Sequence, residues 1–182
     1  SVEVRSIARA IADASGEAFD PGPPRTVGGG CINTAVLLSD GPRRYFVKLN
    51  RADRLPMFDA EAAGLTAMAA TRAIRVPRPL CTGVAGAQAF LAMELIDFGR
   101  SPTGGAATAG RRLAAMHRNR DEQFGWEREN TIGSTSQHNT RHPDWVGFWR
   151  DQRLSFQLAL AARNGFGGQL QAGGEQLLEL FP

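Results

Sequence analysis

Two strand–turn–strand patterns, separated by one helical pattern, limit the folds that this chain can adopt. The predicted strands cover residues 34–38, 45–49, 80–84 and 88–95. Asp40-Gly41 and Gly86 supply the turn signals that join the strands of each pair. Between the pairs, residues 56–73 carry apolar side chains at helical spacing. Two hairpins with a helix between them predict an α+β fold built on an antiparallel sheet.

Helical patterns flank this part of the chain on both sides. Residues 3–15 form the first, and a glycine-containing linker over residues 99–105 precedes the others. Beyond the linker we expect a helix over residues 106–116, a polar loop over 118–142, a long amphipathic helix over 143–163 and a last apolar segment over 177–181. The expected domains are therefore an N-terminal lobe, 1–97, and part of a mainly α-helical C-terminal lobe, 98–182.

Composition excludes several classes of protein. Hydrophobic residues make up 42% of the chain and charged residues 21%, as in a globular protein. No stretch approaches the ~18 apolar residues of a membrane helix, and the first ten residues lack a signal-peptide core, so we expect a cytoplasmic protein without a membrane partner. The net charge is +3, but the arginines are scattered, and we expect no nucleic-acid partner. Cys31 and Cys81 lie in no metal-binding pattern.

Lys48 is the single lysine of a chain that otherwise uses arginine. Strand alternation places it on one face with Phe46, on the second strand after the run Gly28-Gly29-Gly30. A glycine run between strands can cover a nucleotide and present N–H groups to its phosphates, with the compact ammonium of the lysine beneath it. The alternatives are a flexible turn and a lysine that faces solvent.

Glu61 falls inside the apolar stripe of the 56–73 helix, where a carboxylate needs a cation. Lys48 is the available cation, and a pair between the two would aim the ammonium at phosphate oxygens. The alternative is a glutamate at the edge of the stripe that reaches water. Together these features predict a kinase-like nucleotide-binding lobe, with backbone groups of Met93, Glu94 and Leu95 at the adenine edge and Met93 as an apolar wall.

Several short motifs from about residue 25 onward match one known family. They are Gly28-Gly29-Gly30-Cys31-Ile32, Phe46-Val47-Lys48, Phe58-Asp59-Ala60-Glu61, Val76-Pro77-Arg78-Pro79, Met93-Glu94, Phe124-Gly125-Trp126 and Asn130-Thr131-Ile132-Gly133. With them the chain resembles the fructosamine/ketosamine kinases, which belong to the protein-kinase-like, aminoglycoside-phosphotransferase-like superfamily. The resemblance implies phosphorylation of a sugar hydroxyl on a free or protein-bound ketoamine, with ATP and Mg²⁺ as cofactors.

The resemblance also implies roles for the residues of the first lobe. Gly28 to Gly30 would cover the phosphates, with Cys31 beside them. Lys48 would bind α- and β-phosphate oxygens, and Glu61 would orient it. For Cys31 two interpretations stay open: a redox-sensitive thiol and a small apolar residue in a tight turn.

One departure from the family concerns catalysis. The family carries a His-Gly-Asp…Asn loop and an Asp-Pro motif, whose aspartates act as catalytic base and magnesium ligand. No His-Gly-Asp occurs here, so we expect no catalytic residue in this chain, and we expect the metal ligands in a missing part. We predict a truncated chain that is inactive alone and that self-associates through apolar residues of an incomplete C-lobe, including Trp145, Phe148 and Phe156. The alternatives are an aminoglycoside- or choline-type kinase and a non-catalytic ATP-binding module.

Overall fold

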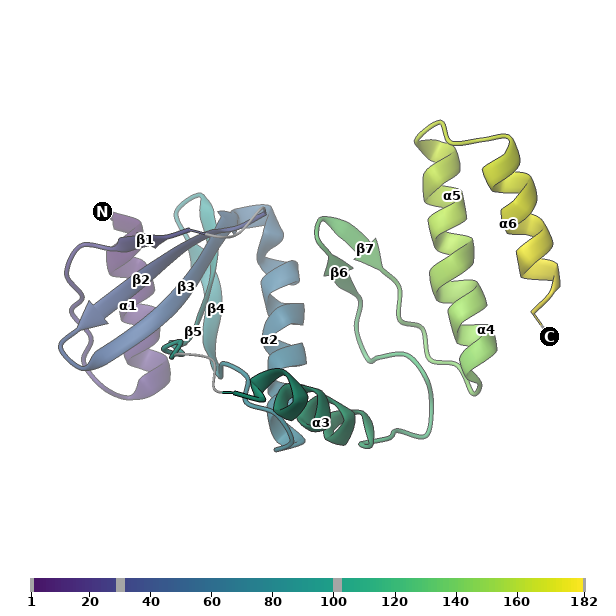
Figure 1. Cartoon of the computed structure of the whole chain (residues 1–182). Coiled ribbons are helices and arrows are strands. Elements are labelled where there is room, and N and C mark those ends of the chain that lie inside the picture. The colour runs from purple at the N-terminus through teal and green to yellow at the C-terminus, as the bar shows by residue number, and fades with distance from the viewer. Residues whose placement is uncertain (1, 29–31, 100–102, 182) are drawn as a thin grey trace. The chain divides into compact units, whose positions relative to one another are not determined.

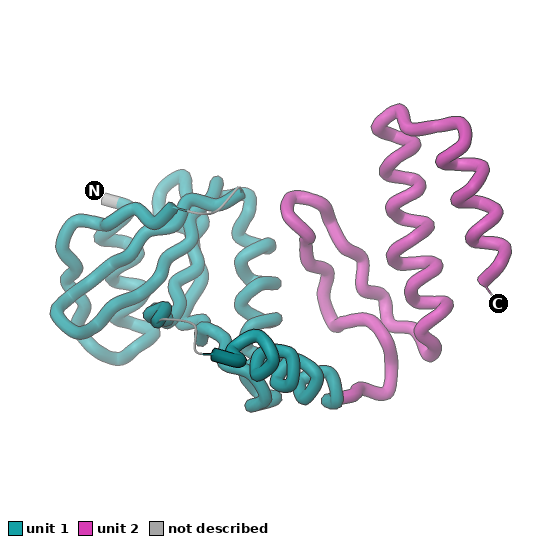
Figure 2. The backbone as a smooth tube through the Cα atoms, in the orientation of Figure 1, with its two compact units in different colours: residues 1–119 teal, residues 120–182 magenta. Residues whose placement is uncertain are grey.

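The computed structural model, which describes residues 2–28, 32–99 and 103–181, contains two compact units (Figure 2). Unit 1 is Ser1–Asn119 and holds a five-stranded sheet with helices (Figure 1). Unit 2 is Arg120–Pro182 and holds a short hairpin followed by helices. The expected α+β class is thus confirmed. The division into lobes at residue 97 stays a prediction.

The sheet of unit 1 is antiparallel throughout, with the strand order β1-β2-β3-β5-β4. Its strands are β1 (Arg25–Val27), β2 (Thr34–Asp40), β3 (Arg43–Arg51), β4 (Pro79–Ala85) and β5 (Gln88–Glu94). Both predicted hairpins are present. Gly41, at φ 59°, turns the chain between β2 and β3, and Gly86, at φ 62°, does so between β4 and β5, which is backbone that glycine adopts without strain.

Two apolar cores form because side chains alternate along each strand. On β3, Val47 is fully buried with Ile7 and Ile11 of helix α1 (Val2–Ser15). Phe46, one position away, packs instead with Phe58 of helix α2 (Leu55–Ala70). The two helices therefore cover opposite faces of the sheet, and Lys48 shares the α2 face with Phe46, as the alternation predicts.

Short elements complete unit 1. A 3₁₀ turn, η1 (Ala52–Arg54), leads into α2, which begins with Pro56 in its first turn, a position that tolerates the missing N–H. Thr82 of β4 donates a hydrogen bond of 2.6 Å to the Asp59 carboxylate and so fixes α2 on the sheet. Helix α3 (Gly105–His117) carries the apolar stripe predicted over residues 106–116.

The segment predicted as a polar loop, 118–142, contains a hairpin that the sequence did not reveal. Its strands are β6 (Asn130–Ile132) and β7 (Thr135–Gln137), with Gly133 at φ 63° in the turn. Three-residue strands give too short a pattern for apolar alternation to be recognised. The Asn139 side chain secures the hairpin by donating to Asn130 Oδ1 (2.9 Å) and to the Arg128 carbonyl (3.0 Å).

The predicted long helix of unit 2 is a continuous run of α4 (Trp145–Trp149), the π-helical η2 (Arg150–Leu154) and α5 (Ser155–Arg163). The Asp144 carboxylate caps its start by accepting from the Gly147 N–H (2.7 Å). Helix α6 (Gln169–Glu179) packs against α5 and includes the start of the last apolar segment. None of the described helices has the length and apolarity needed to span a membrane.

One expectation about unit 2 is wrong. Phe148 is buried, with 4% of its surface exposed, whereas it was predicted on an open apolar face. The guanidinium of Arg153 lies 4.8 Å from its ring centre and covers it. Trp145 is 54% exposed, in line with the prediction.

Candidate nucleotide-binding site

Lys48 and Glu61 meet between strand β3 and helix α2. The ammonium nitrogen of Lys48 lies 2.7 Å and 2.8 Å from the two carboxylate oxygens of Glu61. The side chains are 24% and 31% exposed, respectively, so the pair borders the solvent without being immersed in it. The two residues are thirteen positions apart in the chain, and only the packing of α2 on the sheet brings them together.

The local fold explains why this pair forms. Glu61 follows Phe58 by one helical turn, and Phe58 is fully buried against Leu91 and Met93 of β5. The same turn of α2 therefore presents the carboxylate to the sheet face on which Lys48 lies. The ammonium of Lys48 has three N–H donors, both Glu61 oxygens accept from it, and no other acceptor for Lys48 is present among the described residues. One donor is thus available for an anionic ligand.

The predicted glycine turn is described only in part. Gly28 follows the last residue of β1 and has open space where a Cβ would lie, whereas Gly29, Gly30 and Cys31 lie outside the described residues. On the far side of the turn, Asn50 of β3 donates to the Ile32 carbonyl (3.2 Å) and to Asn33 Oδ1 (2.7 Å). Asn50 thereby fixes the point at which the chain re-enters the sheet, two residues along β3 from Lys48.

Sequence reasoning missed Asn50, although a signal was available. The β2–β3 register pairs Thr34 with Leu49, so Asn33 and Asn50 are the next facing positions. Two facing asparagines next to a glycine run indicate a side-chain bond that closes the turn. That register follows from the turn at Asp40-Gly41, which the sequence does show.

The predicted adenine edge lies at the end of β5. Met93 is buried on the α2 face of the sheet, the face that also carries Lys48. Glu94 is held by the preceding segment: its N–H donates to the Arg78 carbonyl (2.8 Å), and its carboxylate accepts from the Arg78 N–H (3.3 Å) and pairs with Arg75. Leu95 follows directly as partly exposed chain outside regular structure. The side chain of Glu94 is therefore a clamp on the segment 75–78.

The polar groups at the site bear on the kind of ligand that it could hold. Across the residues that the structure describes, no group of three or more His, Cys, Asp or Glu side chains could hold a metal ion. The described polar groups at the site are one ammonium, its carboxylate partner and the asparagine pair at the glycine turn. Of these groups, the ammonium is the donor that suits phosphate oxygens.

A lysine on β3 that is held by a helix glutamate, in an antiparallel sheet, is the arrangement of the nucleotide-binding lobe of a protein-kinase-like fold. Solved structures support this class. The structure of a putative fructosamine-3-kinase from Haemophilus somnus matches 98% of this chain and 63% of its own length, with a TM-score of 0.84 at 24% identity. That of a putative fructosamine-3-kinase from Thermobifida fusca has a TM-score of 0.77 at 26% identity and covers 98% of this chain and 61% of its own length.

The model of the fructosamine kinase family matches residues 3–181, and this chain belongs to that family. It is 46% identical over 160 residues to a probable ketoamine kinase of Synechocystis, covering 87% of this chain and 54% of the relative. It is 47% identical over 139 residues to a chloroplastic protein-ribulosamine 3-kinase of Arabidopsis thaliana, covering 75% and 42%. The chain thus spans about half the length of these relatives.

Proposed function

We propose that unit 1 binds ATP and that Lys48 donates to its α- and β-phosphate oxygens. The observation that carries this proposal is the pair of hydrogen bonds from the Lys48 ammonium to both Glu61 oxygens. This pairing leaves one donor of the ammonium for a ligand. A preformed pair of this kind keeps the lysine aimed, so that little side-chain freedom is lost when the nucleotide binds. The family membership supports ATP as the nucleotide.

The other predicted residues complete the nucleotide site in this proposal. The turn of Gly28, Gly29, Gly30 and Cys31 covers the phosphates, and Asn50 holds its far end. Met93 forms an apolar wall, and backbone groups of Glu94 and Leu95 bond the adenine edge, apart from the Glu94 N–H, which already donates to the Arg78 carbonyl. The lobe 1–97 thus holds the nucleotide, and the segment 98–182 begins the lobe that holds the acceptor.

For the whole protein we propose phosphorylation of a hydroxyl on a free or protein-bound ketoamine. The relatives named ketoamine kinase and protein-ribulosamine 3-kinase support this substrate class. In the reaction, the acceptor oxygen bonds to the γ-phosphorus, the bond from that phosphorus to the β-phosphate oxygen breaks, and the hydroxyl proton passes to a base. Charge on the phosphates would be neutralised by Mg²⁺ when it is bound. We propose the cytoplasm as its location.

The 182-residue chain itself, in our proposal, binds ATP without turning it over. The sequence contains no His-Gly-Asp motif to supply the base. The second candidate function is a non-catalytic ATP-binding module, which fits the lack of that motif equally well. Exposed apolar residues of unit 2, such as Trp145 and Leu180, would promote self-association.

One experiment with two readouts tests these proposals. The purified chain is titrated with ATP by calorimetry, and it is separately incubated with labelled ATP and ribulosyl-lysine. We expect saturable ATP binding and no phosphorylated product above background. The absence of ATP binding to the folded chain would contradict the nucleotide site, whereas clear turnover would contradict only the proposed inactivity.

A further inference from the structure

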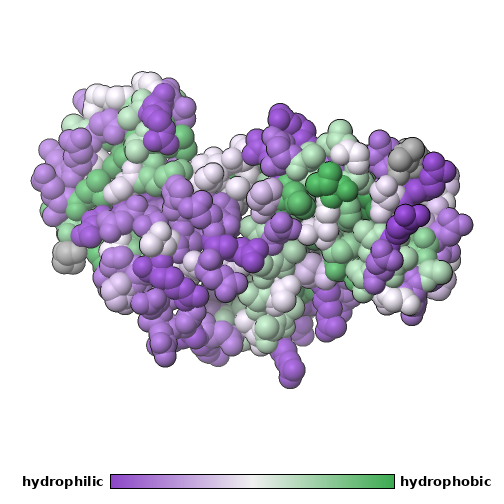
Figure 3. Space-filling model, turned by 180° about the vertical axis from the view of Figure 1, so that it is seen from behind, coloured by the Kyte–Doolittle hydropathy of each residue, from purple (hydrophilic) through white to green (hydrophobic). Residues whose placement is uncertain are grey.

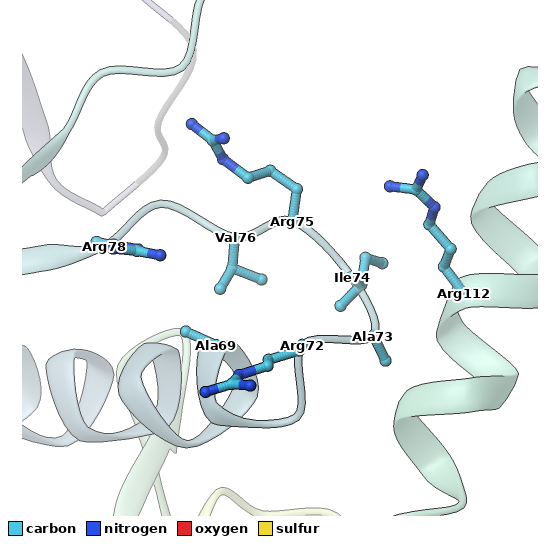
Figure 4. Close-up of a pocket in the computed structure, with 8 residues that line it drawn as sticks. All are labelled: Ala69, Arg72, Ala73, Ile74, Arg75, Val76, Arg78 and Arg112. Atoms are coloured by element: carbon cyan, nitrogen blue, oxygen red, sulfur yellow. The ribbon is translucent and has the colours of Figure 1, made fainter.

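A second charged feature of unit 1 lies at the end of helix α2 and does not include Lys48. A cleft of about 450 Å³ is lined by an apolar floor and an arginine rim (Figure 4). The floor consists of Ala69, Ala73, Ile74 and Val76, and the rim of Arg72, Arg75, Arg78 and Arg112. The proposed ATP site uses none of these side chains.

The arginine rim carries excess positive charge. Arg75 pairs with Glu94, but the guanidinium groups of Arg72, Arg78 and Arg112 have no acceptor among the described residues. No acidic side chain lines the cleft within that same part of the chain. Arg75 and Arg112 extend to the same side of the cleft, although they come from different elements (Figure 4). Guanidinium groups that line one cleft repel one another, and an anion bound between them would offset this repulsion.

The backbone at Arg72 adopts a conformation that favours glycine, so keeping an arginine there has an energetic cost. Arg72 follows the C-cap of α2 and is the one non-glycine residue with a positive φ, 54°, in the described part of the chain. Glycine is the usual residue at this position, because a side chain there costs about 1 kcal/mol. Thr71 fixes the turn by donating to the Met68 carbonyl (2.7 Å) and accepting from the Ala73 N–H (3.3 Å).

We propose that this cleft binds a small molecule that carries two phosphate groups. Planar guanidinium groups bind phosphate oxygens through two parallel hydrogen bonds, and several of them together match a multiply charged anion better than a single carboxylate. The volume suits a small ligand, not a macromolecular surface. Both an inorganic diphosphate and a sugar bisphosphate have this chemistry, and the apolar floor would contact the carbon skeleton of the latter.

Glu94 competes with the ligand for Arg75. A phosphate that takes the Arg75 guanidinium must displace the Glu94 carboxylate, which is partly exposed. Removing that negative charge while keeping the shape of the side chain should therefore strengthen binding. The variant Glu94→Gln provides this test and keeps the backbone groups that we propose for the adenine edge, although the residue borders the ATP site.

The experiment titrates the full chain with inorganic pyrophosphate, fructose 1,6-bisphosphate and citrate by calorimetry at constant ionic strength. We expect both phosphate compounds to bind, and the double variant Arg72→Ala/Arg112→Ala to weaken binding about tenfold. Glu94→Gln should bind more tightly. The matched control, Arg5→Ala/Arg9→Ala, removes the same charge from the exposed face of α1 and should leave the affinity within about twofold.

Pyrophosphate could also bind at Lys48, so Lys48→Met separates the two sites. It should leave pyrophosphate affinity within about twofold, because the cleft lies on different residues. The proposal is overturned if Lys48→Met abolishes binding while the arginine double variant retains it, if both arginine double variants lose affinity equally, or if citrate binds as tightly as the phosphates. A folded chain that takes up none of the three anions overturns it as well. If fructose 1,6-bisphosphate binds more tightly than pyrophosphate, the ligand is an organic bisphosphate. If pyrophosphate binds more tightly, the ligand is an inorganic diphosphate.

Discussion

The two units bury their apolar residues to very different extents. Within the described part of the chain, every buried apolar residue lies in unit 1 except Phe148 and Leu158. Large exposed apolar residues show the opposite bias, and unit 2 carries Phe124, Ile132, Trp145, Phe166, Leu170, Leu177 and Leu180. Hydrophobic surface is visible among the hydrophilic regions in Figure 3. Unit 1 has a core on each face of its sheet, whereas unit 2 has only a small one.

This difference predicts that the two units differ in stability. Burial of apolar surface is the main favourable term in folding, so unit 1 should fold as a stable body and unit 2 should be marginal. The candidate nucleotide site lies wholly on the stable unit, where β3 and α2 hold it. The three tryptophans, Trp126, Trp145 and Trp149, all lie in unit 2, so their fluorescence reports on that unit alone.

The largest effect is expected in the α2 core of unit 1. Phe58→Ala removes a fully buried ring and should lower the free energy of unfolding of unit 1 by about 3–5 kcal/mol. Hydrogen exchange of β5 amides measures this loss, while tryptophan fluorescence in urea should show an unchanged transition. Phe98→Ala, at a residue that is 96% exposed, is the control and should change little. Equal losses in both units would show that they unfold as one.

The next effect concerns the thiol of Cys81 on β4. Burial raises its pKa from the ordinary value of 9.0 to about 11, because the charged thiolate loses hydration. At pH 8 the reactive thiolate is then about a hundredfold rarer than in the unfolded chain, so alkylation by iodoacetamide should be slower by that factor. The contribution of the buried neutral Cys81 thiol to the free energy of unfolding is complete below pH 9 and is lost as the pH rises towards 11.

Mass spectrometry of the alkylated Cys81 peptide, in buffer and in urea, measures the two rates. The native rate should rise with pH until about pH 11. Native labelling at pH 8 as fast as in urea would mean that β4 opens readily, and the contrast between the units would then be weaker than we infer.

A smaller effect is expected where α5 and α6 approach each other in unit 2. A Cβ on Gly174 would lie 2.4 Å from a Leu158 methyl carbon, so Gly174→Ala should destabilise unit 2 by about 1–2 kcal/mol. Gly173 has open space around it, and Gly173→Ala should stabilise the helix by about 0.5–1 kcal/mol. Urea titration followed by tryptophan fluorescence compares the neighbours. A shift of the same sign in both would argue against close packing of α6 on α5.

The sequence predicts the elements that depend on local patterns and misses those that depend on contacts between distant residues. The hairpins and α2 follow from periodic apolar residues, and the position of Lys48 follows from strand alternation, because these patterns are local. The β6–β7 hairpin does not, since its stability depends on Asn139, a residue outside both strands. The π-helical turn over Arg150–Leu154 and the cover that Arg153 gives Phe148 likewise depend on packing between distant residues.

The candidate site divides in the same way. Lys48 and Glu61 are predictable because each one breaks a simple pattern, the first in composition and the second in an apolar stripe. Asn50 is missed because its partner lies across the sheet and polar residues at strand ends are common. The arginine cleft is missed because Arg72, Arg78 and Arg112 are ordinary residues in an arginine-rich chain until the fold gathers them.

ATP affinity of Lys48→Met tests the central claim most directly, measured by calorimetry beside the matched variant Arg44→Ala. Arg44 lies on the same strand and the same face but pairs with Asp97. We predict that Lys48→Met weakens ATP binding about tenfold or more, whereas Arg44→Ala changes it less than about twofold. An unchanged affinity in folded Lys48→Met would contradict the account, because the ammonium held by Glu61 would then have no part in holding the nucleotide.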